Sequence, residues 1–93
     1  MIQRELDAAR RKHPNFACEM TNRSLLNAEE WLGRYRTINS QSSVAENLIN
    51  EEWMEALCEY LAGNRKNCLL ELAHTAVTVI RAMDFVEKEE DGK

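Results

Sequence analysis

Proline and glycine are scarce in this chain, which has one proline and three glycines among 93 residues. Both residues interrupt regular structure, so their scarcity predicts long helices joined by short connections. Alternation of apolar and polar residues with a period of two, the pattern of a half-buried strand, is also missing. We therefore predict a single all-α domain over residues 1–93, with about four helices and a frayed tail over residues 87–93.

Four further absences narrow the possible functions. The longest apolar run is broken by His74 and Arg81, so we expect no membrane span. The net charge is −4 and the basic residues are scattered apart from one N-terminal cluster, so we expect no binding of a nucleic-acid polymer. The first residues are too polar for a secretory signal. No C-x-x-C spacing occurs, which predicts buried, reduced thiols in a cytoplasmic protein at Cys18, Cys58 and Cys68.

Apolar residues recur with helical spacing in four segments, at residues 2–12, 24–38, 43–62 and 64–87. Pro14 ends the first helix. Thr21, Asn22 or Ser24 can cap the second, and Asn64 or Asn67 the fourth. Ser43 with Glu46 fits a capping box for the third. Gly63 supplies the left-handed residue that stops the third helix, and it joins the third and fourth helices as an antiparallel hairpin.

The fourth helix is apolar over more than half of its circumference. Ten of the residues in the stretch 69–83 are apolar, and only a few polar side chains such as Glu71 and His74 interrupt it. A helix of this kind has to be enclosed by other elements, and three short neighbours in one chain offer little cover. We therefore expect this helix to pack at a subunit interface, in a homodimer or a homotetramer.

Acidic residues and one histidine occupy matching heights on the two arms of this hairpin. Glu52 and Glu55 are three residues apart on the third helix, and Glu71 and His74 are three apart on the fourth. The midpoints of the two pairs lie equally far from Gly63 along the chain. If both stripes face the groove between the helices, three carboxylates and an imidazole meet at one place.

Three neighbouring carboxylates repel one another unless protons or a cation neutralise them. Mg²⁺ prefers hard oxygen ligands and is often shared between carboxylates and the phosphates of a substrate. The plain alternative is a solvated helix face, because a chain with 16 acidic residues contains several such pairs by chance. The equal distances of the two residue pairs from Gly63 favour a metal site, since a solvated helix face does not require them.

The segments "EEWMEAL" and "ELAH" resemble the MazG-like all-α nucleoside triphosphate pyrophosphohydrolases. The family pattern is E-x-x-E, a variable gap, then E-x-x-D. Here Glu52-x-x-Glu55 is followed after residues 56–70 by Glu71-x-x-His74, and Glu51 matches a doubled glutamate. The opening "ELDAARRKHPNF" is similar to the A-R-x-K-x-P opening of short phage and bacterial members.

The resemblance implies hydrolysis of a nucleoside triphosphate, with a deoxynucleotide favoured, to the monophosphate and pyrophosphate, with Mg²⁺ or Mn²⁺ as cofactor. It implies that the carboxylates and the histidine of the two motifs hold the metal and that a glutamate accepts a proton from water. The implied phosphate contacts are made by basic residues, and the implied base stacking by aromatic ones. The residues are, for the metal, Glu52, Glu55, Glu71 and His74; for the proton, Glu51 or Glu55; for phosphate, Arg81, Lys12 and Arg11; and for the base, Trp31 and Trp53.

His74 stands where the family pattern has aspartate, and this difference leaves alternatives open. An imidazole suits Mn²⁺, Zn²⁺ or iron better than Mg²⁺, or it can orient a water or a phosphate beside the metal. The chain can also be a non-catalytic relative that acts as a helical interaction module. Finally, Glu71-x-x-His74 matches one half of a ferritin-like di-iron site, which a dimer would complete.

Overall fold

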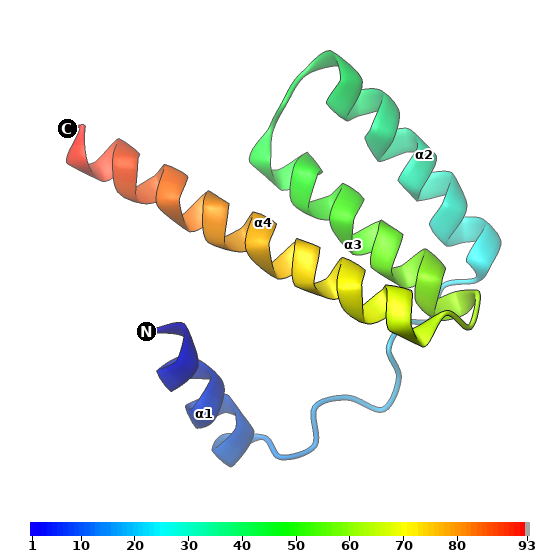
Figure 1. Cartoon of the computed structure of the whole chain (residues 1–93), viewed down its shortest axis with the longest axis horizontal. Coiled ribbons are helices and arrows are strands. Elements are labelled where there is room, and N and C mark those ends of the chain that lie inside the picture. Colours follow the sequence, from blue (N-terminus) through cyan, green and yellow to red (C-terminus); the bar gives the residue numbers. More distant parts are fainter. Residues whose placement is uncertain (93) are drawn as a thin grey trace.

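The computed structural model describes residues 1–92 of the chain, and over these residues the fold is all-α (Figure 1). Four helices follow one another: α1 (Ile2–Lys12), α2 (Leu25–Gln41), α3 (Ala45–Leu61) and α4 (Arg65–Asp91). No strand occurs in the described part of the chain. The predicted fold class and number of helices are therefore confirmed.

Local sequence signals explain several helix ends. The α1 helix ends at Lys12, two residues before Pro14, as predicted. Ser24 is the N-cap of α2, and its hydroxyl accepts a hydrogen bond from the backbone N–H of Asn27 at 3.1 Å. Gly63 has a φ of 87°, the left-handed conformation predicted for the stop after α3.

Three predicted boundaries are wrong. Val44, not Ser43, is the N-cap of α3, and no side chain caps this end, so the predicted capping box does not form. The α2 helix runs on to Gln41 instead of ending at Ile38. The α4 helix runs to Asp91, so residues 87–91 are helical where we predicted a frayed tail, and Lys93 lies outside the described residues. Glutamate and lysine favour helix, which explains the longer α4.

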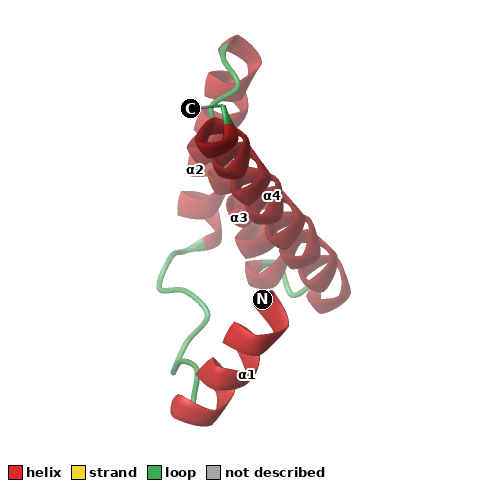
Figure 2. Cartoon of the chain, turned by 90° about the vertical axis from the view of Figure 1, so that its left-hand side faces the viewer, coloured by secondary structure: helices red, strands yellow, loops and turns green. Residues whose placement is uncertain are grey.

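The helices α2, α3 and α4 lie side by side in one thin layer, with α3 in the middle (Figures 1 and 2). Only α2 with α3, and α3 with α4, pack against each other. The whole chain, including α1, measures 44 × 41 × 20 Å. A small core lies between α2 and α3, formed by the buried residues Ala28, Leu32, Met54 and Leu57.

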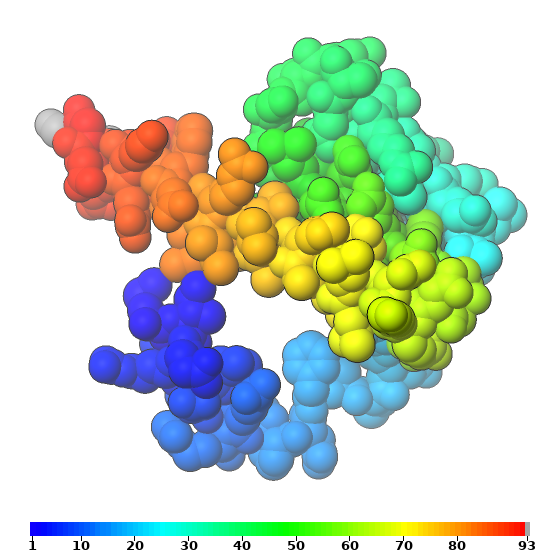
Figure 3. All heavy atoms as spheres, in the orientation of Figure 1, coloured from blue at the N-terminus to red at the C-terminus, as the bar shows by residue number. Residues whose placement is uncertain are grey.

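The α1 helix stands apart from this layer. No other helix packs against it, and it joins α2 through an irregular segment, residues 13–24. Figure 3 shows α1 and this segment projecting from the body formed by α2, α3 and α4. Ile2 and Leu6 are consequently exposed, although they form the apolar stripe of an amphipathic helix.

The three cysteines are free thiols, as predicted, but they are not all buried. Cys68 is buried and Cys58 is partly buried. Cys18 is exposed because the segment before α2 reaches the body only from Met20 onward, where Met20 packs against the core. Burial raises the pKa of the Cys58 thiol, which keeps it protonated at neutral pH. Across residues 1–92, no helix combines the length and apolar composition that crossing a bilayer needs.

Candidate metal centre

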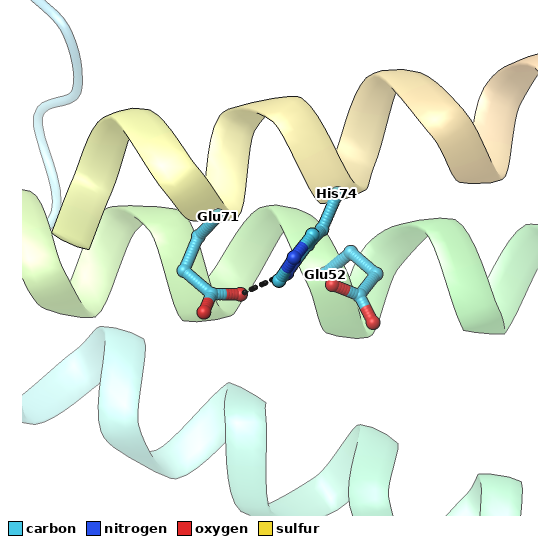
Figure 4. Close-up of side chains that lie close together, drawn as sticks. All are labelled: Glu52, Glu71 and His74. Carbon is cyan, nitrogen blue, oxygen red and sulfur yellow. Dashed lines mark ion pairs between the residues drawn. The ribbon is translucent and has the colours of Figure 1, made fainter.

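Glu52 on α3 and Glu71 and His74 on α4 come together in the groove between the two helices (Figure 4). Each residue offers one potential ligand atom, and these atoms all lie within 4.8 Å of one another. In Figure 4 the side chains of Glu71 and His74 reach from α4 across α3, in the direction of α2, and the Glu52 side chain lies beside them. The predicted meeting of the two stripes across the hairpin is therefore confirmed for these residues.

One oxygen of each carboxylate in this cluster lacks a hydrogen-bond partner. Glu52 Oε2 and Glu71 Oε2 are both buried from solvent, and neither accepts a hydrogen bond. His74 Nδ1 lies 3.5 Å from Glu71 Oε2, an ion-pair distance without the geometry of a hydrogen bond. A buried carboxylate oxygen without a hydrogen-bond partner is costly, so a positive charge or a proton at this place would stabilise the cluster.

Glu55 lies beside this cluster, and its surroundings raise its pKa from 4.5 to about 7. The largest cause is partial burial, followed by hydrogen bonding with Glu71 and by repulsion from the negative charges of Glu52 and Glu71. Arg36 opposes the shift from 3.5 Å away. Near neutral pH, Glu55 is thus divided between its protonated and ionised forms.

Two residues of α2 hold the acidic side of α3 in place, and the sequence analysis missed both. Arg36 Nη2 donates to Glu55 Oε1 at 3.5 Å, and Asn39 Nδ2 donates to Glu51 Oε1 at 2.9 Å. Asn39 Nδ2 also bonds the backbone carbonyl of Asn47 at 3.0 Å. These contacts keep Glu51 turned toward α2, and they place Arg36 next to the cluster without a direct contact to Glu52 or Glu71.

The threonines of α4 do not relieve the unpartnered carboxylates. Thr75 donates its hydroxyl to the backbone carbonyl of Glu71 at 2.8 Å, and Thr78 donates to that of His74 at 2.9 Å. Both hydroxyls are thus committed to their own helix. Glu71 and His74 are fixed on adjacent turns by the regular helix, and the groove wall around them offers no competing donor from these threonines.

The remaining predicted site residues lie elsewhere. Arg81 lines a cavity of about 550 Å³ between the start of α3 and the second half of α4, further along the same groove. Lys12 and Arg11 sit at the end of α1, which packs against no other helix, so the structure does not bring them to the cluster. Trp31 and Trp53 are both half-buried against the core, and the guanidinium carbon of Arg34 lies 4.7 Å from the Trp31 ring centroid.

The donor set of the cluster suits a divalent cation. Two carboxylates and one imidazole offer oxygen and nitrogen ligands, a combination that favours Mn²⁺, iron or Zn²⁺ over Mg²⁺. The buried, unpartnered oxygens of Glu52 and Glu71 are the positions that such a cation would satisfy. The residues present therefore fit a metal ion, with Glu55 close enough to respond to its charge.

Comparisons of this chain with family models, with curated proteins and with solved structures give no match.

Proposed function

We propose that this chain is a metal-dependent nucleoside triphosphate pyrophosphohydrolase, which converts a (d)NTP to the (d)NMP and pyrophosphate with Mn²⁺ or Mg²⁺. One observation carries the proposal: Glu52 and Glu71 each have a buried oxygen without a hydrogen-bond partner. A carboxylate oxygen of each residue and a ring nitrogen of His74 lie within 4.8 Å of one another, in the groove between two helices. The order of these residues along the chain, E-x-x-E followed by E-x-x-H, supports the same activity.

Glu52, Glu71 and His74 would hold the metal ion in this proposal. When bound, the ion supplies positive charge that offsets the negative charge of the carboxylates and of the triphosphate. His74 is half-exposed, and a substrate would approach the cluster from the side of this residue.

Glu55 is the better placed of the two predicted proton acceptors. Its pKa of about 7 suits a group that must take up a proton and release it at neutral pH. Glu51, by contrast, is held toward α2 by the amide of Asn39. In the proposed reaction, Glu55 takes a proton from water as the water oxygen bonds to the α-phosphorus. The bond between the α- and β-phosphates breaks, and pyrophosphate leaves with the bonding electrons.

The cavity next to the cluster supplies a place for the remainder of the substrate. Its volume of about 550 Å³ lies within the usual range for small-molecule sites. It lies along the groove from His74, and Arg81 and Phe85 of α4 line it. Arg81 follows His74 by seven residues, about 10 Å along the helix axis, so its guanidinium suits a phosphate group bound near the cluster.

The test is a screen of the eight common ribo- and deoxyribonucleoside triphosphates with Mg²⁺ or Mn²⁺, with pyrophosphate release as the readout. We expect release from at least one of them and its loss in Glu71→Gln. Glu29→Gln is the matched control, because Glu29 is an exposed glutamate on α2, outside the cluster. If no triphosphate releases pyrophosphate at high protein concentration, the proposed activity is wrong.

A ferritin-like iron site is the second candidate, and the Glu71–His74 pair with Glu52 beside it favours it, because iron accepts this mixed donor set. Metal analysis after aerobic purification separates the two. Bound iron with an absorbing, coloured protein would support the ferritin-like site. A colourless protein activated by Mn²⁺ or Mg²⁺ would support the hydrolase.

A further inference from the structure

An apolar strip runs along α4 on the side away from α3. Its residues alternate in steps of four and three, which is the spacing of a coiled-coil contact. We call this strip the α4 seam, and its members are Leu69, Ala73, Ala76, Ile80 and Met83. Leu69 is 69% exposed and Ile80 is 41% exposed, and Leu70 and Val77 flank the seam with more exposed apolar surface. Cys68 is the only buried residue on α4.

The chain exposes more surface than a folded monomer of its mass normally does. Its accessible surface is 7472 Å², against about 5,500 Å² expected from the usual scaling with mass. The radius of gyration is 15.3 Å, against about 12 Å for a compact chain of this length. The excess of about 1,900 Å² exceeds the roughly 800 Å² that each partner buries in a standard interface, and it is the amount typical of an obligate homodimer.

Part of this excess comes from the projecting N-terminal part of the chain, because residues 1–19 are all exposed. The α1 helix within it is a poor match for the α4 seam. It presents only Ile2, Leu6 and Ala9 on its apolar stripe, and it is about 16 Å long, whereas the α4 seam extends over about 21 Å. A second α4 matches the seam in length and in pattern. Ala73 and Ala76 at its middle have small side chains, which lets two helix backbones approach closely.

The charges at the two ends of α4 indicate the direction of pairing. The basic residues Arg65 and Lys66 begin the helix, and the acidic residues Glu87, Glu89, Glu90 and Asp91 end it. This order is unfavourable with respect to the dipole of the helix itself. An antiparallel partner centred on Ala76 places Lys66 level with residue 86 of the other copy, next to its Glu87. A parallel partner would place like charges together. The guanidinium carbon of Arg65 lies 3.9 Å from the centroid of the Tyr60 ring, so Arg65 is engaged within its own chain. Lys66 is therefore the cation available to pair with Glu87 of the other copy.

We infer that a second copy of this chain covers the α4 seam, and that the two α4 helices pair antiparallel about a two-fold axis at Ala76. The interface is isologous, so each residue of the seam contacts its counterpart on the other copy. On the helical wheel, the seam lies on the opposite side of α4 from Glu71 and His74. Formation of the dimer and occupation of the metal centre are therefore separable.

The test uses the full chain and measures its mass in solution over a range of concentrations, by sedimentation or by light scattering. We expect a dimer, and we expect Ile80→Glu to weaken its association by more than about tenfold, because each dimer would bury two added carboxylates. Leu26→Glu is the control: Leu26 is an apolar residue on α2 that is 68% exposed, outside the seam, and its substitution should leave the dimer intact. Circular dichroism of each variant confirms that the helices remain.

A charge exchange tests the direction. Lys66→Glu and Glu87→Lys should each weaken the dimer, and the double variant should restore it, because the two exchanged charges meet across an antiparallel interface. A wild-type chain that stays monomeric at high concentration would overturn the proposal. In that case, a loss of stability in Leu6→Glu would indicate that α1 of the same chain covers the seam instead. A dimer that Ile80→Glu leaves unchanged would overturn the choice of surface. A double variant as weak as the single ones would overturn the antiparallel direction.

Discussion

Glu55 and Glu71 face each other across the α3–α4 groove, and hydrogen bonding between them helps to raise the pKa of Glu55 to about 7. The folded chain therefore binds a proton at Glu55 more tightly than the unfolded chain does. This difference makes the stability of the metal-free protein depend on pH.

We expect the metal-free protein to lose stability as the pH rises from about 4.5 to about 7. In this window the folded state holds the proton on Glu55 and the unfolded state has released it, so the unfolding free energy falls with increasing pH. The Glu55 side chain is partly solvated, so we expect a loss of about 1 kcal/mol, less than the full shift implies. Thermal melts in a chelator at pH 5 and pH 7.5 measure it.

Glu55→Gln is the control for this effect. An amide does not titrate, so its melting temperature should change less between these two pH values than that of the wild type. Groups distant from Glu55 contribute equally to both proteins, so the difference between the two profiles reports on Glu55 and the carboxylates coupled to it. If the two profiles are parallel, the pKa of Glu55 in the folded chain is not raised.

Metal binding should stabilise the fold. A cation that binds the folded state alone adds about 2.7 kcal/mol when its concentration is a hundred times its dissociation constant. For a domain of this size, that corresponds to an increase of the melting temperature by about 10 °C or more. We expect Mn²⁺ to give this increase in the wild type, with Glu52→Gln and Glu71→Gln each removing most of it.

The matched control for the metal experiment is again Glu29→Gln, which should respond to Mn²⁺ like the wild type. Removing a carboxylate from the cluster relieves repulsion, so we expect Glu71→Gln without metal to be as stable as the wild type or more stable. A melting temperature that Mn²⁺ leaves unchanged at millimolar concentration would exclude a metal centre and favour the interaction module.

The cluster of Glu52, Glu71 and His74 was accessible to sequence reasoning because one tight turn and a constant helix rise determine its geometry. With Gly63 as the turn, Glu52 and His74 are equidistant from it along the chain, and so are Glu55 and Glu71. Two regular helices joined in this way keep equal heights over several turns. The only further assumption was that the two stripes face the groove.

The contribution of α2 could not be obtained in the same way. The connection between α2 and α3 is an extended segment, with Ser42 and Val44 both in the β region, and not a tight turn at a single residue. If α2 and α3 formed a simple hairpin with Ser43 as the turn, Arg36 would lie level with Asn50, because both are equally far from Ser43 along the chain. Arg36 instead contacts Glu55. The offset depends on how the core residues of α2 and α3 pack, and on the reach of the arginine side chain. Neither is readable from spacing alone.

The position of α1 was also beyond the sequence. Its boundaries are those predicted, because Pro14 and the stripe of Ile2 and Leu6 act locally. Where an amphipathic helix docks depends on which apolar surface is free, and the segment 13–24 is long enough to allow several positions. For the same reason, the predicted phosphate contacts of Lys12 and Arg11 stay predictions.

His74 should determine which metal is preferred. An imidazole favours Mn²⁺ over Mg²⁺, whereas a carboxylate suits the hard Mg²⁺ ion. We expect His74→Asp to bind Mg²⁺ more tightly relative to Mn²⁺ than the wild type does, and His74→Ala to bind both ions more weakly. Titration of each variant with each metal, followed by the melting temperature, gives the ratio. A ratio that is the same in wild type and His74→Asp would show that His74 does not contact the ion.

Gly63→Ala should lower the stability of the hairpin turn without affecting metal binding. The φ of 87° at Gly63 is unfavourable for any residue with a Cβ, but an added Cβ would meet no atom within 4 Å. We therefore expect a loss of about 1 kcal/mol in stability from backbone strain alone, with no steric clash. Urea denaturation measures this loss. Because the turn still joins α3 and α4 at the same register, the increase in melting temperature with Mn²⁺ should persist. Loss of that increase would mean that the conformation of Gly63 itself sets the relative heights of Glu52 and Glu71.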